Sequence, residues 1–305
     1  MCAMAVIALG GCSGCGGPPS QLVVEGRYGY LRCASLEPGR QEPWESQGLR
    51  LSVSERTLSV GASDERLELA VIAGPGPGPA ASTLASLRAA LERRPADVVV
   101  MLGGLGDTEN SALATLRGLA GMPTLSLLMG GGRDDGEVWQ DAFDELTDAE
   151  LASVVDARGL RALRFGGSDL MLWSGGPEGR YARTRLSCGF DGDEVEERLH
   201  AVDDVSVVGL ISWTAPAGVG FGLAGLDVGS ESLAASWQSL GNPLGVFAWP
   251  AVLGELAPEE GGASSYFVQR LEGLPALRAD GTPARGRVLR FTWEAGRMRP
   301  VSDAP

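Results

Sequence analysis

Apolar runs and helical repeats alternate along the chain from residue 67 onward. The apolar runs are Leu67 to Ala73, Val98 to Leu102 and Thr124 to Leu128, and a glycine-rich segment ends each of them. Leucines at helical spacing follow the first two runs: Leu84, Leu87 and Leu91, then Leu113, Leu116 and Leu119. Strands that are apolar on both faces and alternate with helices predict a parallel sheet covered on two sides.

Other patterns predict the remaining elements. A helix is expected over Glu137 to Asp156, restarted by a capping box at Thr147 to Glu150. Leu160 to Ser174 has the pattern of a β-hairpin around Gly166-Gly167. The other expected elements are a helix at Asp193 to Ala201, strands at Val205 to Ser212 and Leu244 to Trp249, an edge strand at Arg287 to Glu294, and short strands within 21–60. With no linker evident after residue 20, we predict a single α/β domain over residues 21–305.

The amino end resembles a bacterial lipoprotein signal. Ala3 to Leu9 is a short apolar run, and Leu9-Gly10-Gly11-Cys12 matches the cleavage pattern that leaves a lipid on Cys12. No Arg or Lys precedes Arg27, a departure that a start codon placed too late would explain. We therefore expect residues 1–20 to be a signal and a Gly/Pro tether, and the protein to be held at the cell envelope through a membrane lipid anchor. A flexible glycine- and cysteine-rich tail is the alternative.

Composition narrows the classes of function. The 305 residues carry a net charge of −14, which argues against nucleic acid as a partner because phosphate contacts require a basic surface. The sequence contains one histidine, His200. This count argues against a His-rich metal site and allows only one candidate base for a catalytic triad. In an exported chain Cys33 and Cys188 could form a disulfide, although two buried free thiols are equally compatible with the sequence.

The order of strands and loops resembles the calcineurin-like metallophosphoesterase family over roughly residues 67–295. The resemblance is carried by a strand, loop and helix, then Leu102-Gly103-Gly104-Leu105-Gly106-Asp107, then Leu127 to Asp135. It implies a four-layer α-β-β-α sandwich with two metal ions that activate a water against a phosphate ester. It also implies metal ligands at the ends of successive strands: Asp-x-His, Gly-Asp-x-x-Asp, Gly-Asn-His-Asp/Glu, a lone His and Gly-His-x-His.

The matching positions in this sequence mostly lack those ligands. Gly74 and Gly76 stand at the Asp-x-His motif, and Gly104 stands at the metal-bridging Asp, with only Asp107 matching the later one. The third motif aligns with Gly131-Gly132-Arg133-Asp134, and the later histidines fall near Trp213 and Phe247. If each missing ligand lowers metal affinity or activity about tenfold, the loss of the whole set lowers it more than about a million-fold.

These replacements predict a catalytically inactive, pseudo-phosphoesterase lipoprotein without a cofactor, acting in binding or scaffolding with a protein or peptide partner. The expected remnant site comprises Gly74, Gly76, Gly104, Asp107, Gly132, Arg133, Asp134, Trp213 and Phe247, with no catalytic or metal-binding residue. Aromatic side chains, Trp213 and Trp249 beside Phe221 and Phe247, could supply the binding surface if they are exposed, and core packing is the alternative for each of them. Residual or atypical phosphoesterase activity is one alternative, and a phosphate or other small anion held by the loops and Arg133 is another.

Three further classes fit the sequence less well. Gly76 to Ala81 has the spacing of a dinucleotide-binding loop, but Pro77 and Pro79 cannot donate amides to a phosphate. A serine hydrolase is disfavoured because no Gly-x-Ser-x-Gly motif is present. A glycosidase-type pair of carboxylates stays open, although no two acids are singled out by spacing.

Overall fold

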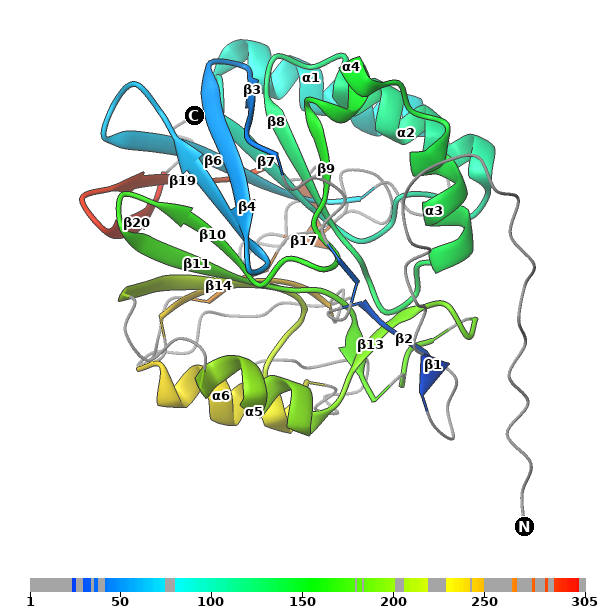
Figure 1. The fold of residues 1–305 in the computed structure, drawn as a ribbon, viewed down its shortest axis with the longest axis vertical. Helices are drawn as coiled ribbons and strands as arrows, with labels where there is room; N and C mark the ends of the chain where they lie inside the picture. The colour runs from blue at the N-terminus through cyan, green and yellow to red at the C-terminus, as the bar shows by residue number, and fades with distance from the viewer. Residues whose placement is uncertain are drawn as a thin grey trace.

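The computed structural model describes residues 24–25, 30–33, 36–37, 42–74, 80–178, 180–182, 184–200, 206–218, 229–241, 243–249, 265–267, 276–277, 283–284 and 288–301. Its helices and strands form four layers in the order α-β-β-α, as the resemblance implied (Figure 1). Among the helices described, none is long and apolar enough to cross a membrane.

The first sheet has six strands in the order β20-β19-β6-β7-β8-β9. Its strands are β6 (Arg66–Ala73), β7 (Val98–Leu102), β8 (Leu125–Met129), β9 (Val154–Asp156), β19 (Leu289–Glu294) and β20 (Arg297–Pro300). The strands β6 to β9 are parallel, while β19 and β20 pair antiparallel. The three apolar runs of the sequence are thus neighbours, and their carboxyl ends lie at one edge.

The second sheet has eight strands in the order β16-β15-β14-β11-β10-β5-β4-β3. Its strands are β3 (Trp44–Ser46), β4 (Leu49–Ser54), β5 (Thr57–Gly61), β10 (Ala162–Phe165), β11 (Ser168–Trp173), β14 (Ser206–Thr214), β15 (Leu244–Trp249) and β16 (Ser265–Phe267). The predicted hairpin is confirmed as β10 and β11. Gly166 and Gly167 make its turn with φ of +58° and +79°, a left-handed backbone that favours glycine.

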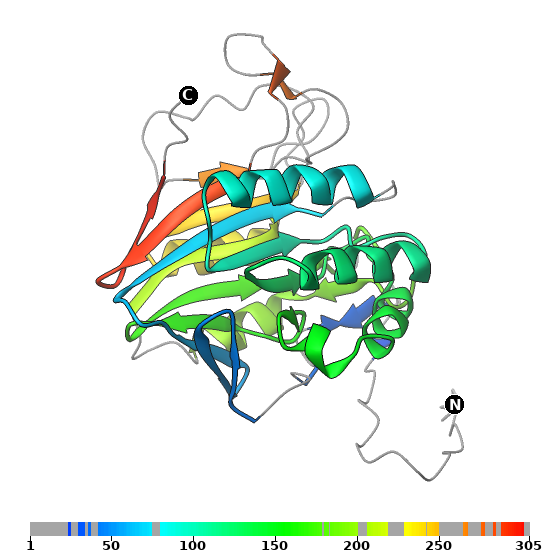
Figure 2. The same cartoon turned by 90° about the horizontal axis from the view of Figure 1, so that it is seen from above.

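Helices cover the outer face of each sheet (Figure 2). The first sheet carries α1 (Ala80–Arg93), α2 (Glu109–Ala120), α3 (Gly136–Asp144) and α4 (Asp148–Leu151), and the second carries α5 (Gly192–His200) and α6 (Glu231–Ser239). The capping box is confirmed at α4, where the Thr147 side chain accepts from the Glu150 amide and the Glu150 carboxylate accepts from the Thr147 amide. Polar capping thus begins the helix at the predicted residue.

The buried apolar side chains form three layers of core: one between the two sheets, and one between each sheet and its helices. Leu127, Leu163 and Ile211 belong to the layer between the two sheets, which also takes in Trp213. Leu87 and Leu116 belong to the layer beneath α1 to α4. Phe190 and Trp237 belong to the layer beneath α5 and α6. Three stacked cores explain why almost every strand residue in the centre of the sheets is apolar.

Two predicted elements differ in the structure. The helix expected through Asp156 ends earlier, because residues 154–156 form β9. This strand pairs with β8 and provides hydrogen-bond partners for the backbone groups at the edge of β8. Val154 and Val155 are β-branched and suit a strand better than a helix. The edge strand predicted at Arg287 to Glu294 forms β19, which does not lie at the edge of its sheet. Ala295 and Gly296 turn the chain back, and β20 pairs with the outer side of β19.

A small third sheet lies beside the carboxyl ends of the strands. Its order is β1-β2-β13-β12, made of β1 (Val24–Glu25), β2 (Tyr30–Arg32), β12 (Gly176–Pro177) and β13 (Cys188–Phe190). A disulfide joins Cys33 to Cys188, with 5.3 Å between their Cα atoms. The structure thus selects the paired alternative for these two cysteines. A separate strand pair, β17 (Ala276–Leu277) with β18 (Pro283–Ala284), completes the described elements.

Candidate functional site

Three glycine-rich loops meet at the carboxyl ends of β6, β7 and β8. The first begins at Gly74, the second runs from Gly103 to Asp107, and the third runs from Gly130 to Asp135. A Cβ atom built on Gly74 would lie 1.8 Å from the carbonyl oxygen of Gly103, so the first two loops are in direct backbone contact. The Gly103 amide donates to the Met129 carbonyl at 2.8 Å, which joins the second loop to the end of β8. We call this edge, formed by the three loops, the rim.

Asp134 ties the second loop to the third. One of its carboxylate oxygens accepts the amide of Gly104 at 2.8 Å, and the other accepts the amide of Gly131 at 2.7 Å. Desolvation raises the pKa of Asp134 to about 6, and the charge of Asp107 adds to the rise. The two amide donors and the positive charge of Arg158 act in the opposite direction. Both carboxylate oxygens are therefore engaged within the protein.

The indole of Trp213 packs on the backbone of the second and third loops. A Cβ atom would lie 2.7 Å from the indole Nε1 if built on Gly103, 2.5 Å from it if built on Gly131, and 2.8 Å from Cζ3 if built on Gly132. Trp213 extends from the end of β14, is 7% exposed, and meets the ring of Tyr181 edge-on at 6.0 Å between centroids. Only residues without a side chain allow this approach, so the glycines and the tryptophan are mutually dependent.

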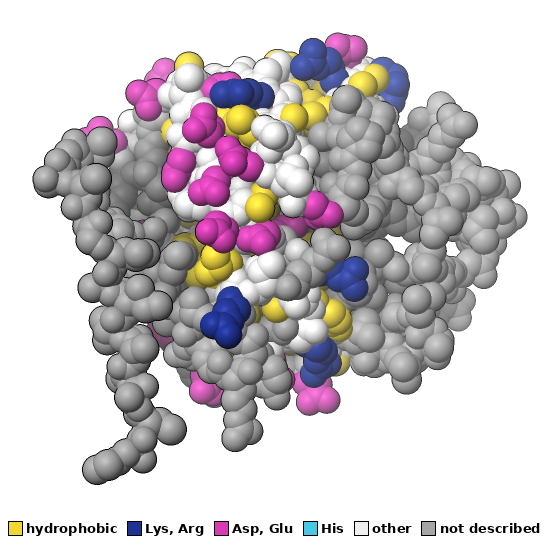
Figure 3. Space-filling model, turned by 90° about the vertical axis from the view of Figure 1, so that its right-hand side faces the viewer, with side chains coloured by type: hydrophobic (Ala, Val, Ile, Leu, Met, Phe, Trp, Pro, Cys, Tyr) yellow, Lys and Arg dark blue, Asp and Glu magenta, His cyan; other side chains and the backbone are white. Residues whose placement is uncertain are grey.

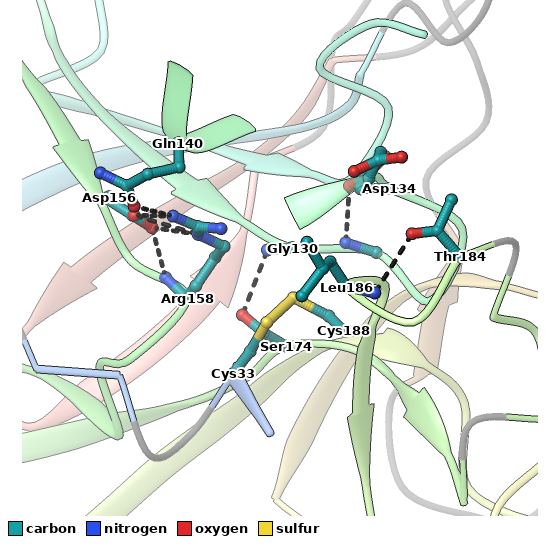
Figure 4. The surroundings of a disulfide bond; sticks show 12 residues. Cys33, Gly130, Asp134, Gln140, Asp156, Arg158, Ser174, Thr184, Leu186 and Cys188 are labelled. Atoms are coloured by element: carbon teal, nitrogen blue, oxygen red, sulfur yellow. Dashed lines mark hydrogen bonds and ion pairs between the residues drawn. A yellow bond between two sulfur atoms is a disulfide. The ribbon is translucent and has the colours of Figure 1, made fainter. Parts of the chain in front are cut away.

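The disulfide lies beside the third loop at Gly130 (Figure 4). A Cβ atom on Gly130 would lie 2.4 Å from the Sγ of Cys188. The Gly130 amide donates to the Ser174 hydroxyl at 3.2 Å, and its carbonyl accepts the Gly175 amide at 2.8 Å. The third loop is therefore packed between Trp213 and the cystine.

The predicted site residues do not all come together. Gly74, Gly104, Gly132, Asp134 and Trp213 lie at the rim. Arg133 and Asp107 are exposed members of the third and second loops. Gly76, Phe221, Cys12 and the side chain of Trp249 lie outside the described residues.

For two of the aromatic residues the structure selects core packing over exposure. Trp213 is buried, because it faces the layer between the sheets. Phe247 is fully buried on the opposite face of the second sheet, where it meets Trp237 edge-on at 5.8 Å between ring centroids. Side chains alternate along a strand, and in β15 the neighbours Val246 and Ala248 take the inner face.

The side chains at the rim differ from the ligand set of the metal pair that the resemblance implies. Within the described residues, no three His, Cys, Asp or Glu side chains are grouped so as to hold a metal ion. Glycine supplies no side-chain donor, the Asp134 carboxylate already accepts two amides, and the Trp213 indole packs against the loop backbone. These residues do not fit a dinuclear metal centre.

The surface beside the third loop is acidic (Figure 3). Its exposed carboxylates, on and around α3 and α4, are Glu137, Asp141, Asp144, Glu145 and Asp148. The amides of Gly104 and Gly131 that face the rim are already bonded to Asp134. Both observations disfavour an anion at this position, because an anion needs free donors and a positive field.

Sequence reasoning missed three contributors to the site. Ser174 follows β11 directly and accepts a hydrogen bond from the third loop, and Tyr181 packs on Trp213. Arg158 is 2% exposed; it bonds Asp156 and lies 5.1 Å from the ring centroid of Trp139. The sequence signal was limited to position: Ser174 is the last residue of the predicted hairpin, and Arg158 lies just beyond the helix predicted through Asp156. Such positions do not reveal contacts across the fold.

Comparisons with known proteins give a likeness in fold. No family model matches the sequence, and no curated protein matches it. One crystal structure aligns with a TM-score of 0.51 over 78% of this chain and 100% of its own, at 12% identity. TT1561 of Thermus thermophilus aligns with a TM-score of 0.45 over 77% of this chain and 98% of its own, at 16% identity. The first alignment supports the α/β sandwich.

Proposed function

We propose that this protein is a phosphoesterase-like scaffold without hydrolytic activity, which binds a protein or peptide partner at the cell envelope. The observation that carries the proposal is the packing of Trp213 on Gly103, Gly131 and Gly132. In the resembled family, metal ligands project from these strand ends. Here a buried apolar ring packs on bare backbone instead, so these strand ends carry a packed tryptophan in place of metal ligands.

The engaged state of Asp134 supports the same proposal. A carboxylate that binds a metal ion must direct an oxygen to it, whereas Asp134 directs both oxygens to backbone amides. Displacing them would leave two amides at the rim without an acceptor, at about 1–3 kcal/mol for each buried donor. The rim is therefore arranged to be stable without a metal.

The Cys33–Cys188 disulfide supports the proposed location. Disulfides form and persist mainly in oxidising compartments outside the cytosol. The signal pattern that ends at Cys12 leads the chain to such a compartment and leaves a thiol for lipid attachment. Together they favour an exported protein anchored by its amino end.

Hydrolysis of bis-p-nitrophenyl phosphate with added Mn²⁺ tests the proposed lack of activity. We expect no release of nitrophenol above that of a Trp213→Ala variant, measured beside an active phosphodiesterase. Turnover that a chelator abolishes, and that Asp134→Asn reduces in the folded protein, would overturn the proposal.

Metabolic labelling with a fatty-acid analogue tests the anchor. Label is expected on the wild-type protein and on Cys15→Ala, the matched control, but not on Cys12→Ala. An unlabelled wild-type protein, or label retained by Cys12→Ala, would contradict lipidation at Cys12.

A further inference from the structure

We propose that the Cys33–Cys188 disulfide is a staple that orders the rim, so that the rim takes the described geometry only in the oxidised protein. The staple joins the amino-terminal segment, described at residues 30–33 and 36–37, to β13. This inference stands apart from the proposed function, since it concerns how the rim is held and not what it binds.

The described residues of the amino-terminal segment are held by the pairing of β2 with β13, by the packing of Tyr30 on Gly189 and by polar contacts. The Leu31 amide donates to the Ser187 carbonyl at 2.9 Å, and Arg32 forms an ion pair with Asp191. Arg56 donates to the Leu36 carbonyl at 3.2 Å. The strand β2 has three residues, and pairings of this length are marginal without further support.

The apolar cluster under this segment is small and separate. It consists of Leu31, Cys33, Leu36 and Cys188, so half of its members belong to the disulfide itself. None of the four belongs to the three apolar layers that hold the sandwich together. Units with few apolar contacts open at lower free energy than the core. Loss of the covalent bond should therefore open this cluster while the sandwich persists.

The same cluster supports the third glycine-rich loop. Cys188 Sγ packs on Gly130, and Leu31 lies against Gly136, where an added Cβ atom would be 3.2 Å from Leu31 Cδ2. The Gly136 amide, at the start of α3, donates to the Leu186 carbonyl at 2.9 Å, two residues before Cys188. Opening of the cluster thus removes one support of the loop, while the packing of Trp213 and the hydrogen bonds of Asp134 remain.

Reduction of the staple needs an external dithiol. One thiolate attacks a cystine sulfur and forms a mixed disulfide, and the second thiol then releases the other cysteine. Two electrons and two protons pass to Cys33 and Cys188, and the dithiol becomes a disulfide. The two residues are 0% and 2% exposed, so the attack requires prior local opening of the segment.

Amide hydrogen exchange of the full chain tests this inference. The oxidised protein is compared with Cys33→Ser/Cys188→Ser and with wild type reduced by dithiothreitol. We expect the amides of Leu31 and Gly136 to exchange about 100-fold faster or more after loss of the bond, while amides of β7 stay protected. The reduced wild type provides the result even if the double variant folds poorly during synthesis.

A core variant separates local from global opening. Leu163→Ala removes a fully buried side chain between the sheets. It should speed exchange in β7 at least as much as at Leu31, which is the reverse of the effect of reduction. Unchanged protection of Leu31 and Gly136 after reduction would overturn the inference, as would an equal loss of protection in β7.

Discussion

Gly131→Ala perturbs the contact on which the description of the rim depends. The added methyl would lie 2.5 Å from Nε1 and 2.9 Å from Cδ1 of Trp213, about 1 Å inside an ordinary contact. The φ of Gly131 is outside the left-handed region, so the substitution adds steric overlap and no backbone strain. The indole has little freedom to withdraw, because it also lies against Gly103 and Gly132.

Overlap of this kind in a packed core costs about 1–3 kcal/mol. Truncation of a buried tryptophan, Trp213→Ala, costs about 3–5 kcal/mol. In the double variant the new methyl occupies space that the indole has left. We therefore expect the double variant to be more stable than the sum of the single effects by about 1–3 kcal/mol.

Urea unfolding followed by far-ultraviolet circular dichroism measures the four free energies, with the slope of the transition as a check on two-state behaviour. Gly61→Ala is the matched control, because its Cβ atom would lie 3.6 Å from the nearest atoms of Arg50. It should change stability by less than about 0.5 kcal/mol. Additive effects of Gly131→Ala and Trp213→Ala, or a Gly131→Ala variant as stable as wild type, would refute the contact.

Three further predictions concern charge and metal. The pKa of Asp134 is raised from 3.8 to about 6, so the folded state binds this proton more tightly than the unfolded state does. As the pH rises from 4 to 6, the stability of wild type relative to Asp134→Ala should therefore fall by at most about 3 kcal/mol, and it should level off above pH 6. A rise in relative stability over that range would contradict the prediction. Arg158→Ala should cost about 3 kcal/mol in urea unfolding, and adding Asp156→Asn should recover part of it; no recovery would show that the ion pair is not the cause. Dialysis against a chelator should leave the thermal midpoint unchanged, whereas a bound metal at 100 times its Kd would add about 2.7 kcal/mol.

Local patterns were sufficient for the elements that depend on neighbouring residues. The strand β7 has the predicted bounds, and the turn at Gly166-Gly167 joins β10 to β11 as expected. Hydrophobic period, helix caps and glycine turns act over a few residues, so a single sequence contains their signal. The helical pattern gave the wrong element at β9, where three residues form a strand because they pair with the edge of β8.

The sequence alone determined the glycine-rich strand ends and the lack of most metal-ligand side chains among them. Only the tertiary structure decided that Trp213 fills the rim, that Phe247 faces away from it, and that Cys33 pairs with Cys188. In a strand that is apolar on both sides, composition does not tell which residues face which layer. The cysteines are 155 residues apart, and their pairing follows from the position of β2 beside β13, which depends on the whole sandwich.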